Sequence, residues 1–347
     1  MKELEQILAL WSQLEAKGEP AVLATVVKTS GSSYRLPGAR LLLSPTGQRA
    51  GSVSGGCLED DLLKKAWWLT ENGPVVRRYD TTPDGEIAAE YGLGCNGIIH
   101  VLLERLSPGQ AGILQLIRQV RQTRTPAVVE HILAPARAVG SFRITSNTPE
   151  PAGSQFEFFT ETLTPPLRLL IFGAGDDAVP LVTQAKFLGW EVWVFDGRAH
   201  YARRDKFPHA DEVIVRTPGG PDPSLPIDDW TAAVLMNHSY SQDMQMLKEL
   251  SGRDLRYLGI LGPRKRALQM LSEAGLQSFI AQPVLHAPMG LDIGADGPEQ
   301  VALAVVAEIQ ATLNCRRGGP LRDRTGSIHA SESSAPENVW VQSIVCA

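Results

Sequence analysis

One glycine-rich turn, Gly173 to Ala178, constrains the fold of this chain more than any other feature. It has the pattern Gly-x-Gly-x-x-Ala and lies between an apolar run at 167–172 and a helical pattern at 178–188. At such a place Gly173 permits a tight turn, and Gly175 lets the backbone approach a ligand. Asp196 ends the next apolar run, about 20 residues on, where dinucleotide-binding folds place a ribose-binding carboxylate. The pattern predicts a Rossmann-like unit.

The remainder of the second half favours a doubly wound parallel sheet. Strand and helix patterns alternate after Pro165-Pro166, as crossover connections between parallel strands require. The predicted strands are 191–195, 212–216, 232–236 and 257–261, and the predicted helices are 244–250, 264–274 and 298–313. We therefore predict an α/β fold in which residues 165–318 form a Rossmann-like domain. Residues 319–347 are polar and rich in serine, and we expect a disordered tail.

Residues 1–164 predict a separate mixed α/β domain. Apolar residues recur at helical spacing before Gly18, and further helical patterns cover 58–69 and 112–121. Predicted strands cover 21–28, 39–44, 75–79, 98–104 and 127–132. The domain is interrupted by two glycine-rich loops, and each of them carries one cysteine.

Composition excludes several classes of function. A net charge of −5 argues against non-specific binding to nucleic acid or to an anionic membrane. The four cysteines form no Cys-x-x-Cys pair, which fits a reducing compartment. The N-terminal pattern is that of an amphipathic helix, and no apolar run is long enough to cross a bilayer. We expect a cytoplasmic protein.

Cys57 is the most reactive candidate in the first half. It follows Gly55 and Gly56 and precedes the helix predicted over 58–69. The positive end of a helix dipole favours a thiolate, which can act as a nucleophile, a soft metal ligand or a sulfur carrier. Cys95 lies in the second glycine-rich loop. The alternative is that both cysteines are small buried residues of tight turns.

The glycine turn of the second half also allows two interpretations. Asp176 and Asp177 place negative charge where a bound pyrophosphate would lie, so their repulsion opposes binding of NAD(P). Both aspartates are equally suited to begin a helix. The glycines then serve the turn and its packing, and the fold is Rossmann-like without a dinucleotide.

Three cations, Arg264, Lys265 and Arg266, begin a predicted helix and oppose its dipole. A bound phosphate would explain them, although long cationic side chains also point into water. Asp292 lies in the glycine-punctuated loop before the last helix, where it either contacts a ligand or turns the chain. His238 and Asp243 follow a strand at the same kind of edge and are candidates for a ligand-facing pair.

Taken in order, these motifs resemble the xanthine dehydrogenase accessory (XdhC/CoxI) family over residues 1–319. The matching segments are Pro37–Arg40, Ser54–Glu59, Gly94–Gly97, Phe172–Gly175, Asp196–Arg198, Leu258–Gly262 and Pro288–Ala295. The chain departs from many relatives at Asp176, where they carry His, and at Pro263, where they carry Ser. Both departures touch predicted anion-binding positions.

The resemblance implies a molybdenum cofactor (molybdopterin) chaperone. Such a protein binds and shields the cofactor, assists its sulfuration and delivers it to a xanthine dehydrogenase-type molybdenum hydroxylase. It would be an accessory protein without turnover chemistry of its own. A cysteine desulfurase is a further implied partner, and a homodimer is the expected assembly.

The predicted cofactor contacts combine the resemblance with the motifs. Cys57 is the principal contact and a candidate molybdenum ligand, and Cys95 assists it. The other predicted cofactor-binding residues are Gly55, Gly56, Gly173, Gly175, Asp196, Arg264, Lys265, Arg266 and Asp292. Two alternatives stay open. One is an NAD(P)-dependent oxidoreductase, and the other is a scaffold that recruits the desulfurase and the hydroxylase without holding cofactor.

Overall fold

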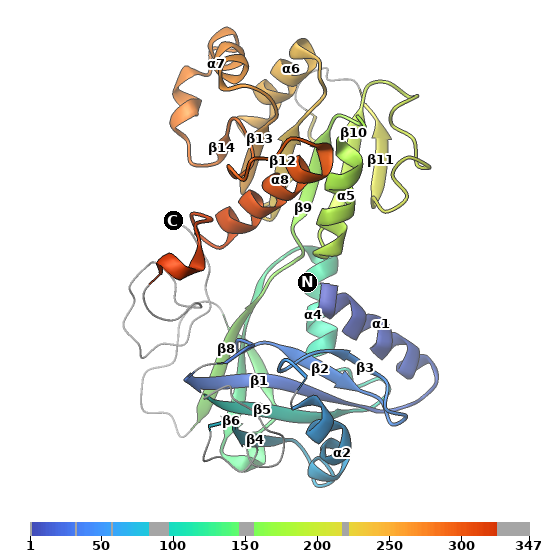
Figure 1. Cartoon of the computed structure of the whole chain (residues 1–347). Coiled ribbons are helices and arrows are strands. Elements are labelled where there is room, and N and C mark those ends of the chain that lie inside the picture. The colour runs from blue at the N-terminus through green and yellow to red at the C-terminus, as the bar shows by residue number, and fades with distance from the viewer. Residues whose placement is uncertain are drawn as a thin grey trace. The chain divides into compact units, whose positions relative to one another are not determined.

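A computed structural model describes residues 2–31, 33–56, 58–82, 97–145, 156–216 and 222–324. These residues form two compact units, 2–165 and 166–324, and each builds its own core (Figure 1). Among the described residues, no helix has both the length and the apolar character needed to cross a membrane.

The first unit is built on a five-stranded antiparallel sheet in the order β3-β2-β1-β5-β4. Its strands are β1 (Ala21–Gly31), β2 (Arg40–Leu43), β3 (Arg49–Gly51), β4 (Val75–Asp80) and β5 (Gly97–Leu106). The central strand β1 alternates between two cores, because successive side chains of a strand point to opposite faces. Val22 packs into one apolar cluster, and Leu23 packs into another on the opposite face.

Helices cover both faces of this sheet. Trp11 of α1 (Lys2–Ala16) and Ile117 of α4 (Ile113–Thr123) pack in the cluster that contains Leu23. Leu62 of α2 (Glu59–Leu69) packs in the cluster that contains Val22. The unit is completed by a three-stranded antiparallel sheet in the order β7-β6-β8, made of β6 (Ala127–Ala134), β7 (Phe142–Thr145) and β8 (Glu157–Leu163).

A buried polar cluster links the two sheets of this unit. Arg40 of β2 forms an ion pair with Glu161 of β8, and Nε2 of His131 on β6 lies 2.7 Å from Glu161 Oε1. Burial alone would raise the pKa of Glu161, but the charge of Arg40 and the contact with His131 lower it to about 2. Burial raises the pKa of the neighbouring Glu104 on β5 to about 7, against the opposing charge of Arg40. These two nearby carboxyls, Glu161 and Glu104, therefore have widely different pKa values.

The second unit contains a six-stranded, entirely parallel sheet in the order β11-β10-β9-β12-β13-β14. Its strands are β9 (Arg168–Phe172), β10 (Glu191–Asp196), β11 (Glu212–Val215), β12 (Thr231–Leu235), β13 (Tyr257–Ile260) and β14 (Leu285–His286). Counted along the chain, the spatial order is 3-2-1-4-5-6, which is that of a Rossmann fold. The predicted fold class is confirmed.

Four helices cover the two faces of the parallel sheet (Figure 1). Helices α5 (Ala178–Phe187) and α8 (Pro298–Leu313) pack with Leu169 and Ile171 of β9. Helices α6 (Tyr240–Leu250) and α7 (Arg264–Glu273) pack on the opposite face with Leu170 and Phe172. All five residues of β9 are buried, as expected for a central parallel strand covered on both sides.

The sequence patterns missed four strands, β3, β7, β8 and β14, and placed the start of α6 four residues late. β14 has two residues and β3 has three, too few for a periodic signal. In β8, the buried Glu161 occupies an inward position where the pattern requires an apolar residue. Its burial depends on Arg40, which is 121 residues away in the chain.

Candidate functional site

The glycine-rich turn before α2 is organised around the carboxylate of Glu59. Oε1 of Glu59 accepts hydrogen bonds from the backbone N–H groups of Val53 (3.0 Å) and Ser54 (2.9 Å) and from the Ser52 hydroxyl (2.7 Å). Oε2 accepts the N–H of Gly56 (3.1 Å) and the Ser54 hydroxyl. One buried side chain therefore fixes the backbone of residues 53–56.

Glu59 carries a full negative charge inside this turn. Burial of the carboxylate alone would raise its pKa, but hydrogen bonds from Ser54 and Ser52 outweigh that effect and lower it from 4.5 to about 2. Ser54 Oγ also accepts the N–H groups of Gly56 (3.2 Å) and Leu58 (3.1 Å). The N–H groups of this turn thus bind a carboxylate of the protein itself, that of Glu59, rather than an external anion.

The predicted residues of the first unit are only partly described. Gly55 and Gly56 are exposed, and Gly56 has φ +117, a conformation that favours glycine. Cys57 and Cys95 lie outside the described residues. Sequence reasoning assigned Glu59 no role. The signal was a glutamate in the first turn of a helix, after two serines that could donate to it.

In the second unit, the glycine turn lies where the strand order reverses between β9 and β12. A Cβ atom on Gly173 would lie 2.8 Å from the backbone nitrogen of Asn237 and closer still to the carbonyl of Met236. Gly173 has φ +123 and donates its N–H to the carbonyl of Phe195 (2.8 Å). Only glycine therefore permits this approach of the turn to the chain after β12.

Asp196 is buried at the end of β10 and binds groups of its own chain. Its Oδ2 accepts the N–H of Ala174 (2.9 Å), which belongs to the glycine turn, and its Oδ1 accepts the N–H of Arg198 (2.9 Å). The Arg198 guanidinium donates to both oxygens, at 2.9 and 2.8 Å. Burial opposes ionisation, but these hydrogen bonds lower the pKa of Asp196. The carboxylate predicted to bind a ribose thus holds the glycine turn through the N–H of Ala174.

The two aspartates of the turn also form ion pairs within the unit. Lys206 Nζ lies 2.8 Å from Asp176 Oδ1 and donates to the carbonyl of Ala174 (2.8 Å). His238 Nε2 lies 2.9 Å from Asp177 Oδ2, so this pair connects the start of α5 to the chain after β12. Carboxylates thus occupy the N-terminal end of α5, where a Rossmann fold binds a pyrophosphate.

Another predicted cation, Arg266, is connected to the glycine turn through Asp243 and Asn237, since a Cβ atom on Gly173 would lie 2.8 Å from the backbone nitrogen of Asn237. Arg266 Nη2 donates to Asp243 Oδ2 at 2.6 Å, and Asp243 Oδ1 accepts the side-chain amide of Asn237 at 2.8 Å. Asp243 is buried with these partners, so it does not form the suggested pair with His238. The remaining candidates Arg264, Lys265 and Asp292 are exposed.

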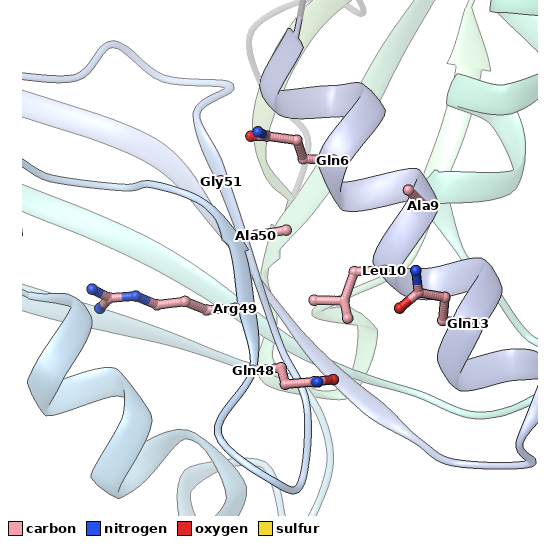
Figure 2. A pocket seen from close by; sticks show the side chains of 8 residues that line it. All are labelled: Gln6, Ala9, Leu10, Gln13, Gln48, Arg49, Ala50 and Gly51. Atoms are coloured by element: carbon pink, nitrogen blue, oxygen red, sulfur yellow. The ribbon is translucent and has the colours of Figure 1, made fainter.

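A pocket of about 580 Å³ lies between α1 and β3 of the first unit (Figure 2). Its polar lining consists of the amides of Gln6, Gln13 and Gln48 together with Arg49. The Arg49 side chain points away from the other labelled side chains, and its guanidinium lies 3.8 Å from Asp60 of α2. The pocket contains none of the predicted site residues, and we assign it no ligand.

Within the described ranges, no group of three or more His, Cys, Asp or Glu could hold a metal ion.

The fold and its two turns define a class of protein with a mixed α/β unit followed by a Rossmann-like unit. Comparison with known proteins agrees, since residues 14–80 match the XdhC and CoxI family and residues 169–309 match the XdhC Rossmann domain. A probable xanthine dehydrogenase subunit from Bacillus subtilis (strain 168) is 32% identical over 314 residues, covering 85% of this chain and 93% of that protein. The chain belongs to the XdhC and CoxI family.

Two further similarities cover most of the chain. The molybdenum cofactor insertion chaperone PaoD of Escherichia coli (strain K12) is 26% identical over 297 residues, which cover 84% of this chain and 83% of PaoD. The crystal structure of a xanthine dehydrogenase from Bacillus halodurans superimposes with a TM-score of 0.76 at 31% identity. That similarity covers 89% of this chain and 96% of the other.

Proposed function

We propose that this protein is a maturation chaperone that binds molybdenum cofactor as cargo and delivers it to a xanthine dehydrogenase-type molybdenum hydroxylase. The observation that carries the proposal is the similarity to a molybdenum cofactor insertion chaperone over more than four-fifths of both chains. Protection of the cofactor and assistance in its sulfuration, with a cysteine desulfurase as donor, belong to the same proposal. So does a homodimeric assembly.

In this proposal Cys57 contacts the molybdenum centre and Cys95 assists. A soft thiolate suits a metal that already carries sulfur ligands. Residues 53–56, which precede Cys57 in the sequence, have their backbone fixed by the carboxylate of Glu59.

The geometry favours this role over an NAD(P)-dependent oxidoreductase. Asp196 has its oxygens engaged by Ala174 and Arg198, while Asp176 and Asp177 place carboxylates at the start of α5. A dinucleotide would have to displace these internal contacts and overcome the repulsion of two carboxylates.

The proposal is tested by cofactor content. The full chain is purified from a host that makes molybdenum cofactor, and molybdenum and pterin are measured per protein. We expect both to co-purify with the wild type and to be lost in Cys57→Ala and in Cys57→Ser, since a hydroxyl keeps the size of the thiol but not its softness. Cys95→Ala should retain part of the cofactor.

The competing functions predict different results. Absence of cofactor from the wild type, together with tight NAD(P)H binding and turnover, would establish the oxidoreductase instead. Absence of cofactor together with retained capture of a hydroxylase and a desulfurase would favour the scaffold. Sedimentation of the purified protein tests the homodimer separately.

A further inference from the structure

Tyr34 is an exposed aromatic residue beside the turn that Glu59 organises. Its side chain is 69% exposed, although an aromatic ring of this size gains free energy from burial. A Cβ atom on Gly55 would lie 3.8 to 4.0 Å from three atoms of the Tyr34 ring. The ring therefore stands next to the glycines that precede Cys57.

The backbone around Tyr34 is held in place while its ring stays exposed. The Ser33 hydroxyl donates to the carbonyl of Arg35 (2.7 Å), and the Arg35 guanidinium donates to Glu3 of α1 (2.9 Å). Gly38 then donates its N–H to the carbonyl of Val26 on β1 (2.7 Å). A loop fixed on both sides of an exposed ring presents that ring at little further cost in conformational entropy.

The outward face of the turn is suited to a flat ligand rather than to a phosphate. The N–H groups of Val53, Ser54 and Gly56 already donate to the Glu59 carboxylate, so an external anion would have to compete with an internal one. Among the described residues, no heavy atom lies within 4 Å of a Cβ placed on Gly56. Exposed glycine backbone next to an aromatic ring leaves room for a planar ring to stack.

We propose that Tyr34 is the stacking residue for the pterin ring of the cofactor, beside the floor formed by Gly55 and Gly56. This inference rests on the proposed function, because it names how the same site holds its cargo. Aromatic stacking of this kind recognises the π-face of a heterocycle and needs no hydrogen bond from the turn. In this arrangement Tyr34 binds the ring system of the cargo.

Binding of a free pterin provides the test. Pterin-6-carboxylate, which lacks molybdenum and the dithiolene sulfurs, is titrated into the wild type, Tyr34→Ala, Tyr34→Phe and the control Trp68→Ala. Trp68 is 70% exposed on α2 and serves as a matched exposed aromatic. We expect roughly 5- to 150-fold weaker binding for Tyr34→Ala, near wild-type binding for Tyr34→Phe, and no change for Trp68→Ala. Stacking should also quench the pterin fluorescence in every protein that keeps an aromatic ring at position 34.

Cofactor content in a host that makes the cofactor separates failure of this inference from failure of the proposed function. If the wild type carries cofactor and Tyr34→Ala carries as much with equal pterin affinity, the stacking role is overturned and the chaperone role stands. If the wild type binds neither cofactor nor pterin, both are overturned. Guanosine monophosphate is titrated in parallel, and binding of this nucleotide that depends on Tyr34, without pterin binding, would also overturn the pterin assignment.

Discussion

Replacing Glu59 by glutamine should destabilise the first unit and change its response to acid. The carboxylate accepts hydrogen bonds from Val53, Ser54 and Gly56 and from two serine hydroxyls. Glutamine keeps one oxygen acceptor but places an NH₂ donor against groups that are themselves donors. Neighbouring backbone N–H groups would then lose their acceptor in a buried position.

The magnitude follows from the pKa of the carboxyl. Its lowering from 4.5 to about 2, at about 1.4 kcal/mol for each pKa unit, corresponds to about 3 kcal/mol in favour of the ionised form. We expect Glu59→Gln to lower the free energy of unfolding at neutral pH by roughly 2–3 kcal/mol, within the range for a broken buried hydrogen-bond network.

The sign of the pH dependence is set by the same pKa. Because the folded-state pKa lies below the unfolded one, the stabilisation is complete above about pH 4.5 and is lost as the pH falls toward about 2. Near pH 3.5 the wild type should have lost roughly 1–2 kcal/mol from this group, and the glutamine variant should lack that loss. Glu161 titrates in the same range in both proteins, so its contribution cancels in the difference.

The assay is urea unfolding followed by circular dichroism at neutral pH and near pH 3.5. Glu71→Gln is the matched control, because Glu71 is exposed just beyond the same helix. The assigned role of the carboxylate would be refuted if Glu59→Gln were as stable as the wild type at neutral pH. It would also be refuted if the variant lost as much unfolding free energy in acid as the wild type does. A loss of equal size in Glu71→Gln would show that any charge removal near α2 has this effect.

Three further perturbations test the rest of the structure. In the wild type, burial raises the pKa of Glu104 to about 7, so the carboxyl must ionise in a buried place as the pH rises. The free energy of unfolding of the wild type should therefore fall by roughly 2–3 kcal/mol between about pH 5 and pH 8, and Glu104→Gln should abolish this fall. Urea titrations of the variant that show the wild-type pH dependence would contradict this. Gly173→Ala should cost at least about 2 kcal/mol, since its Cβ would strike the carbonyl of Met236 at a φ of +123, and an unchanged midpoint in thermal unfolding would show that the turn can shift. Asp196→Asn should lower the free energy of unfolding by roughly 1–3 kcal/mol, because it weakens the contact with Arg198. If the variant binds NADH more tightly than the wild type, as measured by fluorescence, the contact between Asp196 and Arg198 blocks a dinucleotide.

The fold of the second unit was predictable because its strand and helix patterns are formed by residues close together in the sequence. Each central strand is a short apolar run, and Gly173 follows the first of them directly. A parallel strand buried on both faces needs such a run, and the intervening helices show their own period. The helix 298–313 was predicted with the observed bounds for this reason.

The buried polar residues of the first unit gave no such signal. Arg40 and Glu161 form a buried ion pair although they are 121 residues apart in the sequence. Taken alone, each charged residue would be predicted to be exposed. Glu59 shows the same limit at short range, because its charge is buried only through the fold of the turn around it. Charge pairing depends on distance in space, which periodicity along the chain does not report.

Patterns along the chain predicted the α/β fold class and the Rossmann-like unit, and the ordered motifs carried the resemblance to the family that the comparisons then showed. The contacts of the predicted site residues, by contrast, are visible only in the folded protein. Asp196 holds Ala174 and Arg198, Arg266 holds Asp243, and Glu59 takes the N–H groups that could have received a phosphate. Hydrophobic period is a property of neighbouring residues, whereas the partner of a charged group is chosen by the folded chain as a whole.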